Sequence, residues 1–259
     1  AHEEGIATPI LLGRRDKIEQ LKEEIEFEAN VEIIDPKSDE EEERKNAYAE
    51  TYWNQSKRRG ITQLAARKLL RERNYFAAMM VNEGDADALI SGFSRNYPTV
   101  VKPMLELIGL DKGATRIATT NVLMTQRGPL FLSDTSINID PTSKDLAKIA
   151  QMTATTVKMF GLEPVMAMIS YSNFGSSNNE KASKVRQAVS YLHRFYPSLI
   201  VDGEFQTDFA LNNEMRQDIF PFSKLAGRKV NTLIFPNLDS ANITYKLLKE
   251  LNKVENIGP

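Results

Sequence analysis

The fold is decided by residues 165–202, which read VMAMISYSNFGSSNNEKASKVRQAVSYLHRFYPSLIVD. Residues 165–170 form a short apolar run typical of a buried strand, and residues 199–202 form another. Between them, residues 180–196 repeat apolar side chains at helical spacing, after a polar segment in which Gly175 and several serines favour a loop. This order predicts a β-α-β unit, whose two strands lie parallel in one sheet.

The same alternation continues on both sides of this unit. Towards the C-terminus we expect a helix near 209–216, a strand at 232–236 and a helix at 240–251. Before the unit, residues 142–160 carry an apolar stripe that predicts a helix, capped by Thr142 or Ser143 and ended by Gly161. Residues 115–124 and 129–134 predict a hairpin or two adjacent strands.

The first part of the chain repeats the pattern with different elements. We expect strands at 9–13, 31–34 and 88–92, and helices at 15–28, around 48–53, at 62–82 with Gly84 as its cap, and at 100–108. A change of composition at Asp140-Pro141-Thr142 places the expected boundary between two domains, residues 1–141 and 142–259. The predicted fold class is therefore α/β with mostly parallel sheets.

Composition and charge exclude several classes of function. Lys and Arg total 33 against 35 Asp and Glu, and the net charge of −2 gives no sign of a basic groove for nucleic acid. The chain has no Cys, which excludes disulfides, thiolate metal sites and cysteine nucleophiles, and its histidines are His2 and His193 alone. No apolar run of about 18 residues is present, so we expect no membrane span. The first residues lack the order of a signal peptide, which makes the cytoplasm the expected location.

The common nucleotide and metal motifs are also missing. The sequence contains no G-x-G-x-x-G, no G-x-x-x-x-G-K-[ST] and no H-E-x-x-H pattern. We therefore expect no dinucleotide site, no P-loop, no cofactor and no metal ion in this chain.

Four polar loops follow predicted strands, and in open α/β sheets ligands bind beyond the carboxyl ends of strands. The loops cover residues 92–98, 170–177, 202–208 and 236–242. In the first, Arg95 is suited to a phosphate or carboxylate, and the alternative is an ion pair with a local Asp. The second offers hydroxyl and amide groups suited to an oxyanion, and the alternative is ordinary turn chemistry.

The other two loops carry carboxylates. Asp202, Glu204 and Asp208 lie within seven residues and suggest a metal ion or an acid/base pair, although no His accompanies them. In the fourth loop, Asp239 or Ser240 can simply cap the last helix.

Seven segments in fixed order resemble the phosphate acetyl/butyryl transferase family, and most of all the branch fused to the C-terminal side of bacterial NADP-dependent malic enzymes. They are GIATPILLGR (5–14), GDADALISG (84–92), GPLFLSDTSINIDPT (128–142), ISYSNFGSS (169–177), VDGEFQTDFAL (201–211), LIFPNLDSANITYKLLKEL (233–251) and IGP (257–259). Each segment alone is weak evidence, but the ordered set is specific and extends over almost the whole chain.

The resemblance implies a fold, a ligand and an assembly. It implies two three-layer α/β/α domains of the isocitrate/isopropylmalate dehydrogenase type, with a cleft between them that binds an acyl-CoA or acyl phosphate. It also implies a homo-oligomer, a dimer or larger. Carried over by position, the expected ligand-binding residues are Ser94, Arg95, Asn96, Tyr97, Lys102, Ser172, Asn173, Ser176 and Asn237. No catalytic residue is assigned.

Two departures from the family pattern bear on activity. Phosphotransacetylases carry a G-A-T-H-S-T-A-D-T-V-R-P-like segment where this chain has GFSRNYPTVVKP at residues 92–103, so Arg95-Asn96-Tyr97 replaces small hydroxyl residues and Lys102 replaces an Arg. Family members also continue past the equivalent of Gly258-Pro259 into an S-R-G segment with a following Asp, which activates the CoA thiol. The first domain is therefore expected to lack both this return segment and a strand before residue 1.

Three functions remain open on these grounds. The first is a catalytically inactive domain of an NADP-dependent malic enzyme, which acts as an acetyl-CoA-responsive regulatory and oligomerisation module. Its partner would be the malic enzyme domain of the same polypeptide, which converts malate to pyruvate and holds the NADP and a divalent metal. The alternatives are an active phosphate acetyltransferase and a ligand-free structural domain. For acyl transfer, Asp134, Asp202 and Glu204 are conceivable bases, but nothing in the sequence selects among them.

Overall fold

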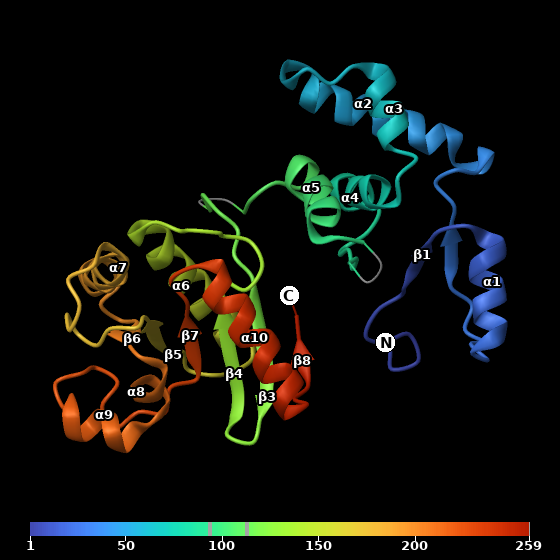
Figure 1. Ribbon diagram of the computed structural model, residues 1–259. Coiled ribbons are helices and arrows are strands. Elements are labelled where there is room, and N and C mark those ends of the chain that lie inside the picture. The colour runs from blue at the N-terminus through green and yellow to red at the C-terminus, as the bar shows by residue number, and fades with distance from the viewer. Residues whose placement is uncertain (93–94, 112–113, 259) are drawn as a thin grey trace. The chain divides into compact units, whose positions relative to one another are not determined.

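The chain divides into two units, and the computed structural model describes residues 1–92, 95–111 and 114–258 (Figure 1). The division falls after residue 113, whereas the change in composition predicted it after residue 141. The structure differs because the hairpin at residues 120–133 pairs with a strand far ahead in the sequence, with Phe131 beside Thr232. The hairpin therefore belongs to the sheet of the second unit.

The first unit consists of a parallel strand pair followed by helices. Its elements are β1 (Ile10–Leu12), α1 (Arg15–Glu24), β2 (Glu32–Ile34), η1 (Asp39–Glu41), α2 (Glu42–Ser56), η2 (Lys57–Arg59), α3 (Gln63–Leu69), α4 (Arg73–Glu83) and α5 (Tyr97–Leu107). In the strand pair, Leu11 lies opposite Ile33. The helices bury an apolar cluster that contains Tyr52, Phe76 and Met79, and this burial is what stabilises their packing.

Two predictions for the first unit are wrong. The expected helix at 62–82 is two helices, because Glu72 accepts hydrogen bonds from the backbone N–H groups of Asn74 and Tyr75 at 2.9 and 3.2 Å and so starts α4 anew. The expected strand at 88–92 does not form within the described residues 84–92, where Ile90 is 98% exposed. Gly84 ends α4 in the left-handed conformation (φ +83°), as its position predicted.

The second unit contains a mixed sheet in the order β6-β5-β7-β4-β3-β8. Its elements are β3 (Thr120–Thr125), β4 (Gly128–Ser133), α6 (Ser143–Met159), β5 (Val165–Ile169), α7 (Glu180–Phe195), β6 (Ile200–Phe205), α8 (Thr207–Leu211), α9 (Asn213–Ile219), β7 (Thr232–Ile234), α10 (Leu238–Asn252) and β8 (Asn256–Ile257). Strands β6, β5, β7 and β4 run parallel, and β3 joins β4 and β8 in antiparallel pairs. The predicted α/β class with a mostly parallel sheet is confirmed.

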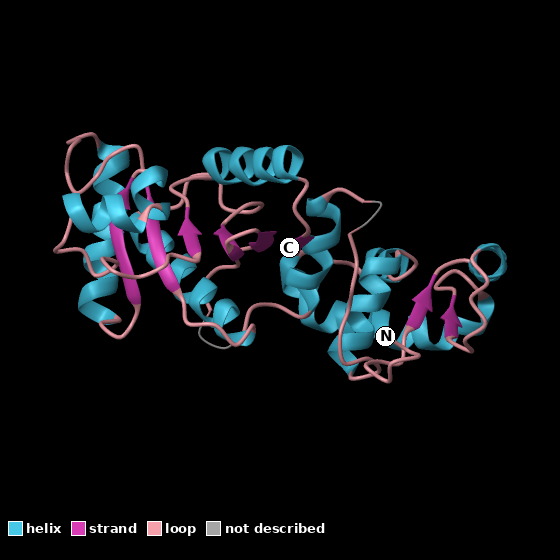
Figure 2. Cartoon of the chain, turned by 90° about the horizontal axis from the view of Figure 1, so that it is seen from below, coloured by secondary structure: helices cyan, strands magenta, loops and turns pink. Residues whose placement is uncertain are grey.

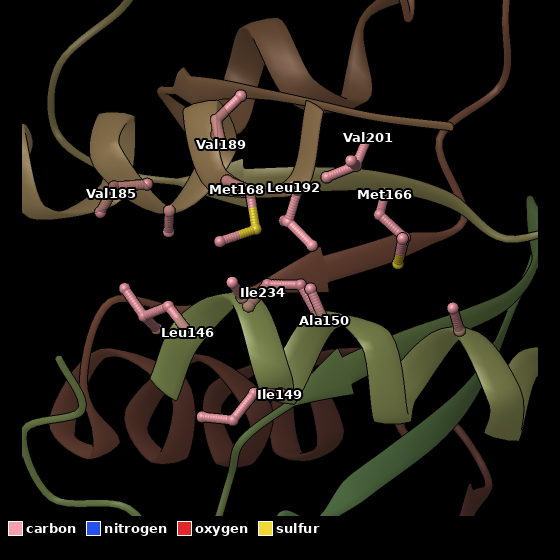
Figure 3. Packing of buried hydrophobic residues seen from close by; sticks show 13 residues of the cluster. Leu146, Ile149, Ala150, Met166, Met168, Val185, Val189, Leu192, Val201 and Ile234 are labelled. Carbon is pink, nitrogen blue, oxygen red and sulfur yellow. The ribbon is translucent and has the colours of Figure 1, made fainter. Parts of the chain in front are cut away.

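Helices cover both faces of this sheet (Figure 2). On one face, α6 and α7 bury side chains such as Leu146 and Val189 against Met168 of β5 (Figure 3). On the other face, Ala210 of α8 and Ala241 of α10 share a buried apolar cluster with strand residues such as Ala167 and Leu233. Burial on both faces explains why β5 is apolar at every position.

Local signals set the helix boundaries of the second unit. Thr142 and Asp145 form a reciprocal capping box at the start of α6, so Thr142, one of the two predicted capping residues beside Ser143, is the N-cap. The expected helix at 209–216 is instead two short helices, because Asn212 accepts a hydrogen bond from the backbone N–H of Met215 and starts α9. Within the described ranges, no helix combines the length and the hydropathy needed to span a bilayer.

Candidate functional site

A pocket of about 260 Å³ lies at the carboxyl ends of β5 and β7. Ser170 and Tyr171 directly follow β5, and Pro236 and Asn237 lie between β7 and α10. The pocket is also lined by Ile139, Asp140, Lys181, Lys184 and Asp239. This is the edge of the sheet at which open α/β proteins bind their ligands.

Two lysines bring positive charge to this pocket. Lys181 and Lys184 lie in the first turns of α7, where the helix dipole is also positive. Lys184 Nζ lies 2.5 Å from Asp140 Oδ1, and this hydrogen bond, together with the ammonium charge, lowers the pKa of Asp140. Among the described residues, no ion pair joins Lys181 to a carboxylate. Positive charge at a helix N-terminus is unfavourable alone, and it favours an anionic ligand.

The loop after β5 holds three of the predicted ligand residues, and their side chains bond within the loop. Ser172 is fully buried, and its hydroxyl donates to Glu204 Oε1 at 2.8 Å. Asn173 Nδ2 donates to Gln206 Oε1 at 3.1 Å, and Asn173 Oδ1 accepts from the Gln206 backbone N–H at 2.8 Å. Ser176 Oγ lies 3.0 Å from Ser172 Oγ. These bonds fix the shape of the loop, and contact with a ligand stays a prediction.

Glu204 organises this loop from beneath. Its side chain is fully buried, and Oε1 accepts hydrogen bonds from Ser172 Oγ and from the backbone N–H of Gly175 at 2.9 Å. Its other carboxylate oxygen lies 3.3 Å from Arg186 Nε of α7. Gly175 needs a φ of +89°, and a Cβ there would meet Arg186 Nη1 at 2.8 Å, so glycine suits this position.

An aromatic cluster supports the loop from the other side. Phe174 packs its ring against Phe205, Phe220 and Phe222, with centroid separations of 4.8, 5.0 and 4.8 Å. The geometry of each pair is close to edge-on, which aromatic rings prefer. The loop is therefore held rigidly between the Glu204 carboxylate and this cluster.

The other two carboxylates considered as bases also have structural bonds. Asp202 accepts hydrogen bonds from the Ser223 hydroxyl and from the backbone N–H of Lys224, both at 2.8 Å. Asp134 accepts from the backbone N–H groups of Thr119 and Asn138, at 3.0 and 2.7 Å. Both carboxylates therefore bond within the local fold, and neither lines the pocket described above.

The carboxylates of residues 202–208 do not form a metal site. Asp202 and Glu204 are bonded as described, and Asp208 Oδ1 accepts from the backbone N–H of Phe209 at 2.9 Å. In the part of the chain that the structure describes, no three His, Asp or Glu side chains lie close enough together to hold a metal ion.

Apart from Asn237, the remaining predicted ligand residues belong to the first unit. Arg95 is exposed, and Asn96 caps α5 by accepting from the backbone N–H of Thr99 at 3.2 Å. Tyr97 is the first residue of α5, and Lys102 Nζ lies 3.8 Å from a carboxylate oxygen of Glu106. Ser94 lies outside the described residues.

Glu106 links this helix to the core of the first unit. It accepts hydrogen bonds from the hydroxyls of Tyr52 and Tyr75, at 3.1 and 2.7 Å. Burial, and then the hydrogen bond to Glu106, raise the pKa of Tyr75 above its ordinary value. The carboxylate therefore fixes α5, the helix that Asn96 starts.

The structure places one further predicted ligand residue on the pocket wall, together with two lysines that the sequence analysis did not single out. Asn237 lines the pocket, and its contact with a ligand stays a prediction. Asn237 also caps α10 by accepting from the Ser240 backbone N–H at 2.9 Å, whereas the sequence predicted Asp239 or Ser240 as the cap. The two pocket lysines were missed. Their signal was present, because two cations in the first turns of a helix oppose the helix dipole.

Comparisons with known proteins place this geometry in a family. The whole chain, residues 1–259, matches the family described as phosphate acetyl/butaryl transferase. The NADP-dependent malic enzyme of Haemophilus influenzae is 35% identical over 98% of this chain, but only 34% of the enzyme is covered. The chain thus spans about a third of the malic enzymes that it matches.

Phosphate acetyltransferases match over a larger share of their length. The enzyme of Thermoanaerobacterium thermosaccharolyticum is 36% identical over 99% of this chain and 79% of its own length. A solved phosphotransacetylase from Streptococcus pyogenes gives a TM-score of 0.86, with 34% identity over 99% of this chain and 78% of that chain. The agreement of sequence, fold and family match leads to one conclusion: the chain belongs to the phosphate acetyl/butyryl transferase family.

Proposed function

We propose that this chain binds an acyl phosphate or acyl-CoA and serves acyl transfer between phosphate and CoA. The observation that carries the proposal is the pocket at the carboxyl ends of β5 and β7, which is lined by Lys181, Lys184, Ser170 and Asn237. Cations, amide groups and a helix N-terminus together suit a phosphate group. The match to phosphate acetyltransferases over most of their length supports the same ligand class.

The proposed reaction needs an anion site and a base. The sulfur of CoA attacks the acetyl carbonyl carbon, the bond from that carbon to the phosphate oxygen breaks, and phosphate leaves with the electron pair. The thiol proton passes to a general base. In this scheme Lys181 and Lys184 stabilise the charge on the departing phosphate, which is the step at which preorganised cations act.

We place the general base outside the three buried carboxylates. Asp134, Asp202 and Glu204 each accept hydrogen bonds that hold the fold, and a base must be free to take a proton. The family resemblance implies a Ser-Arg-Asp segment beyond the equivalent of Gly258-Pro259, and we propose that this segment supplies the base in the full polypeptide.

A second candidate function rests on these same bonded carboxylates. We propose as the alternative that the domain binds acetyl-CoA without turnover and regulates a malic enzyme domain in the same polypeptide, as part of a homo-oligomer. The identity of 35–38% to NADP-dependent malic enzymes supports this candidate. NADP and a divalent metal would then be bound by the malic enzyme domain, and coupling requires that acetyl-CoA binds its active and inhibited states with different affinity.

One pair of assays separates the two candidates. Calorimetric titration of the chain with acetyl phosphate and acetyl-CoA measures binding, and thioester formation from acetyl phosphate and CoA measures transfer in the full polypeptide. Binding with turnover supports acyl transfer, and binding without turnover supports the regulatory domain. If neither ligand binds with saturation, both candidates are rejected.

The lysine pair gives the assay a structural control. Because each lysine can make a charge-assisted contact to phosphate, the double substitution Lys181→Gln and Lys184→Gln should weaken acetyl phosphate binding about tenfold or more. Lys158→Gln, at an exposed position of α6 outside the pocket, should leave the dissociation constant unchanged. Equal affinity in the double variant would exclude the pocket as the phosphate site.

A further inference from the structure

A second cavity of about 500 Å³ lies in the second unit, at the opposite edge of the sheet from the site above. It opens where β4 and β7 begin: Gly128 is the first residue of β4, and Val230 and Asn231 directly precede β7. Because β4 and β7 run parallel, these residues mark the amino ends of the strands, whereas the lysine pocket lies at the carboxyl ends. The two cavities are therefore separate sites.

The walls of this second cavity are apolar side chains that the fold leaves half-buried. They come from separate elements: Leu130 from β4, Leu162 from the segment before β5, Leu211 from the end of α8, and Leu248 from α10. Val254, just after α10, closes one side. The volume is within the range of about 300–1,000 Å³ that is typical of small-molecule pockets, whose walls are mostly apolar with a few placed polar groups.

Two cations lie at the mouth of the cavity. Arg127 is in the turn between β3 and β4, and its guanidinium donates to the backbone carbonyl of Leu211 at 2.8 Å. Lys229 Nζ donates to the backbone carbonyl of Arg127. Both side chains belong to exposed residues, and among the described residues neither forms an ion pair with a carboxylate. The carbonyl bonds hold the two positive charges in place without neutralising them.

We propose that this cavity binds a small amphipathic anion, namely a carboxylate with an unbranched apolar tail. The tail would lie against Leu130, Leu162 and Leu248, and the carboxylate would meet Arg127 and Lys229. Charge complementarity selects the headgroup, because a guanidinium and an ammonium beside each other favour a carboxylate. The apolar walls select the tail, since each buried methylene contributes to binding. This site is independent of the proposed acyl transfer function.

A ligand series tests both halves of the proposal. Calorimetric titration of the full chain compares hexanoate, octanoate and octanol. Octanoate should bind with saturation and about fourfold more tightly for each methylene that it adds to hexanoate. Octanol, which has the tail without the charge, should bind about tenfold or more weakly than octanoate. Equal binding of octanoate and octanol would overturn the assignment of the cations.

Variants then locate the binding site. The double substitution Arg127→Gln and Lys229→Gln should weaken octanoate about tenfold or more. Val254→Trp should fill the cavity and abolish binding, with its fold checked by circular dichroism. Arg194→Gln, an exposed cation on α7 outside the cavity, is the matched control and should leave octanoate binding unchanged. Octanoate affinity that neither the double variant nor Val254→Trp changes would overturn the proposal.

Two further results keep this proposal distinct from others. Saturating acetyl phosphate should leave the octanoate isotherm unchanged, because the two cavities lie at opposite edges of the sheet; direct competition would overturn a separate site. Sedimentation tests whether a second copy of the chain covers this face instead. If the chain does not bind octanoate but self-associates, and Val254→Trp abolishes the self-association, the occupant of this cavity is a second copy of the chain and the small-anion proposal is wrong.

Discussion

Arg216 provides the sharpest test of how the second unit is held together. Its side chain is fully buried, and its guanidinium donates to four backbone carbonyls: those of Phe209 and Ala210 at 2.8 and 2.7 Å, Leu225 at 3.0 Å and Arg228 at 2.6 Å. Burial lowers the pKa of this guanidinium below its ordinary value, but an arginine side chain stays protonated at neutral pH. One cation therefore joins α8, α9 and the segment that leads to β7.

We predict that Arg216→Met destabilises the second unit by about 3–5 kcal/mol. The substitution removes the side-chain donor from all four carbonyls; that of Leu225 keeps the backbone N–H of Arg228, so up to three are left unsatisfied, at about 1–3 kcal/mol each. Removing a desolvated cation offsets part of that cost, so the net loss is smaller than the separate costs added together. In a domain of this size, each kcal/mol of lost stability lowers the melting temperature by about 2–4 °C, so we expect the melting temperature to fall by about 6–20 °C.

The assay is thermal and urea unfolding followed by circular dichroism. Arg216→Lys keeps the charge but loses the planar fork, so its stability should lie between wild type and Arg216→Met. Arg194→Met is the control, because Arg194 is an exposed residue of α7 and its substitution should change stability by less than about 0.5 kcal/mol. An Arg216→Met protein within about 1 kcal/mol of wild type would refute the argument that this side chain satisfies the four carbonyls.

Three other predictions concern carboxylates of the second unit. Asp140→Asn should free Lys184 and tighten acetyl phosphate binding about two- to fivefold in calorimetry, and the gain should shrink with added salt; weaker binding would contradict this. Glu204→Gln should cost about 2–3 kcal/mol in urea unfolding, because it removes the anion from a buried ion pair, and a neutral result would contradict the role of Glu204 in the loop. Burial raises the pKa of Asp145, but hydrogen bonds from Thr142 and a nearby guanidinium outweigh it, and the net pKa lies below 3.8. The stability that this carboxylate contributes is therefore complete above about pH 4 and is lost as the pH falls through the lowered pKa. Asp145→Asn should make the free energy of unfolding depend less steeply on pH below about pH 4. If wild type and Asp145→Asn lose stability in parallel as the pH falls, this role of Asp145 is wrong.

The sequence predicted the second unit better than the first, and the reason is local. The strand at 165–169 and the helix at 180–195 are long, strongly periodic and bounded by loop residues, so few alternatives compete. In the first unit, the run at 88–92 has the composition of a strand, but the described residues give it no neighbour to pair with. Strand formation depends on a partner that composition does not reveal.

The candidate site was predicted in part for a similar reason. The order of loops placed Asn237 and the serine loop at the correct edge of the sheet, because that edge follows from the parallel topology. The sequence could not show that Ser172 points inward to Glu204, a residue 32 positions later. Nor could it distinguish the two pocket lysines from the other cations of an amphipathic helix.

The contacts of Glu204 explain why polarity alone was a poor guide to chemistry. A loop rich in hydroxyl groups is typical of a binding site. Here, however, the hydroxyl of Ser172 and the backbone N–H of Gly175 donate hydrogen bonds to the buried carboxylate of Glu204. That carboxylate would otherwise carry an uncompensated charge, so the loop stabilises Glu204 as much as Glu204 shapes the loop. Charged groups without an ion-pair partner are more informative, because a ligand of opposite charge can pair with them. Among the described residues of this unit, the cations that line a cavity without an ion pair are Lys181 at one edge of the sheet and Arg127 and Lys229 at the other, and we expect an anion to supply the missing counter-charge at both edges.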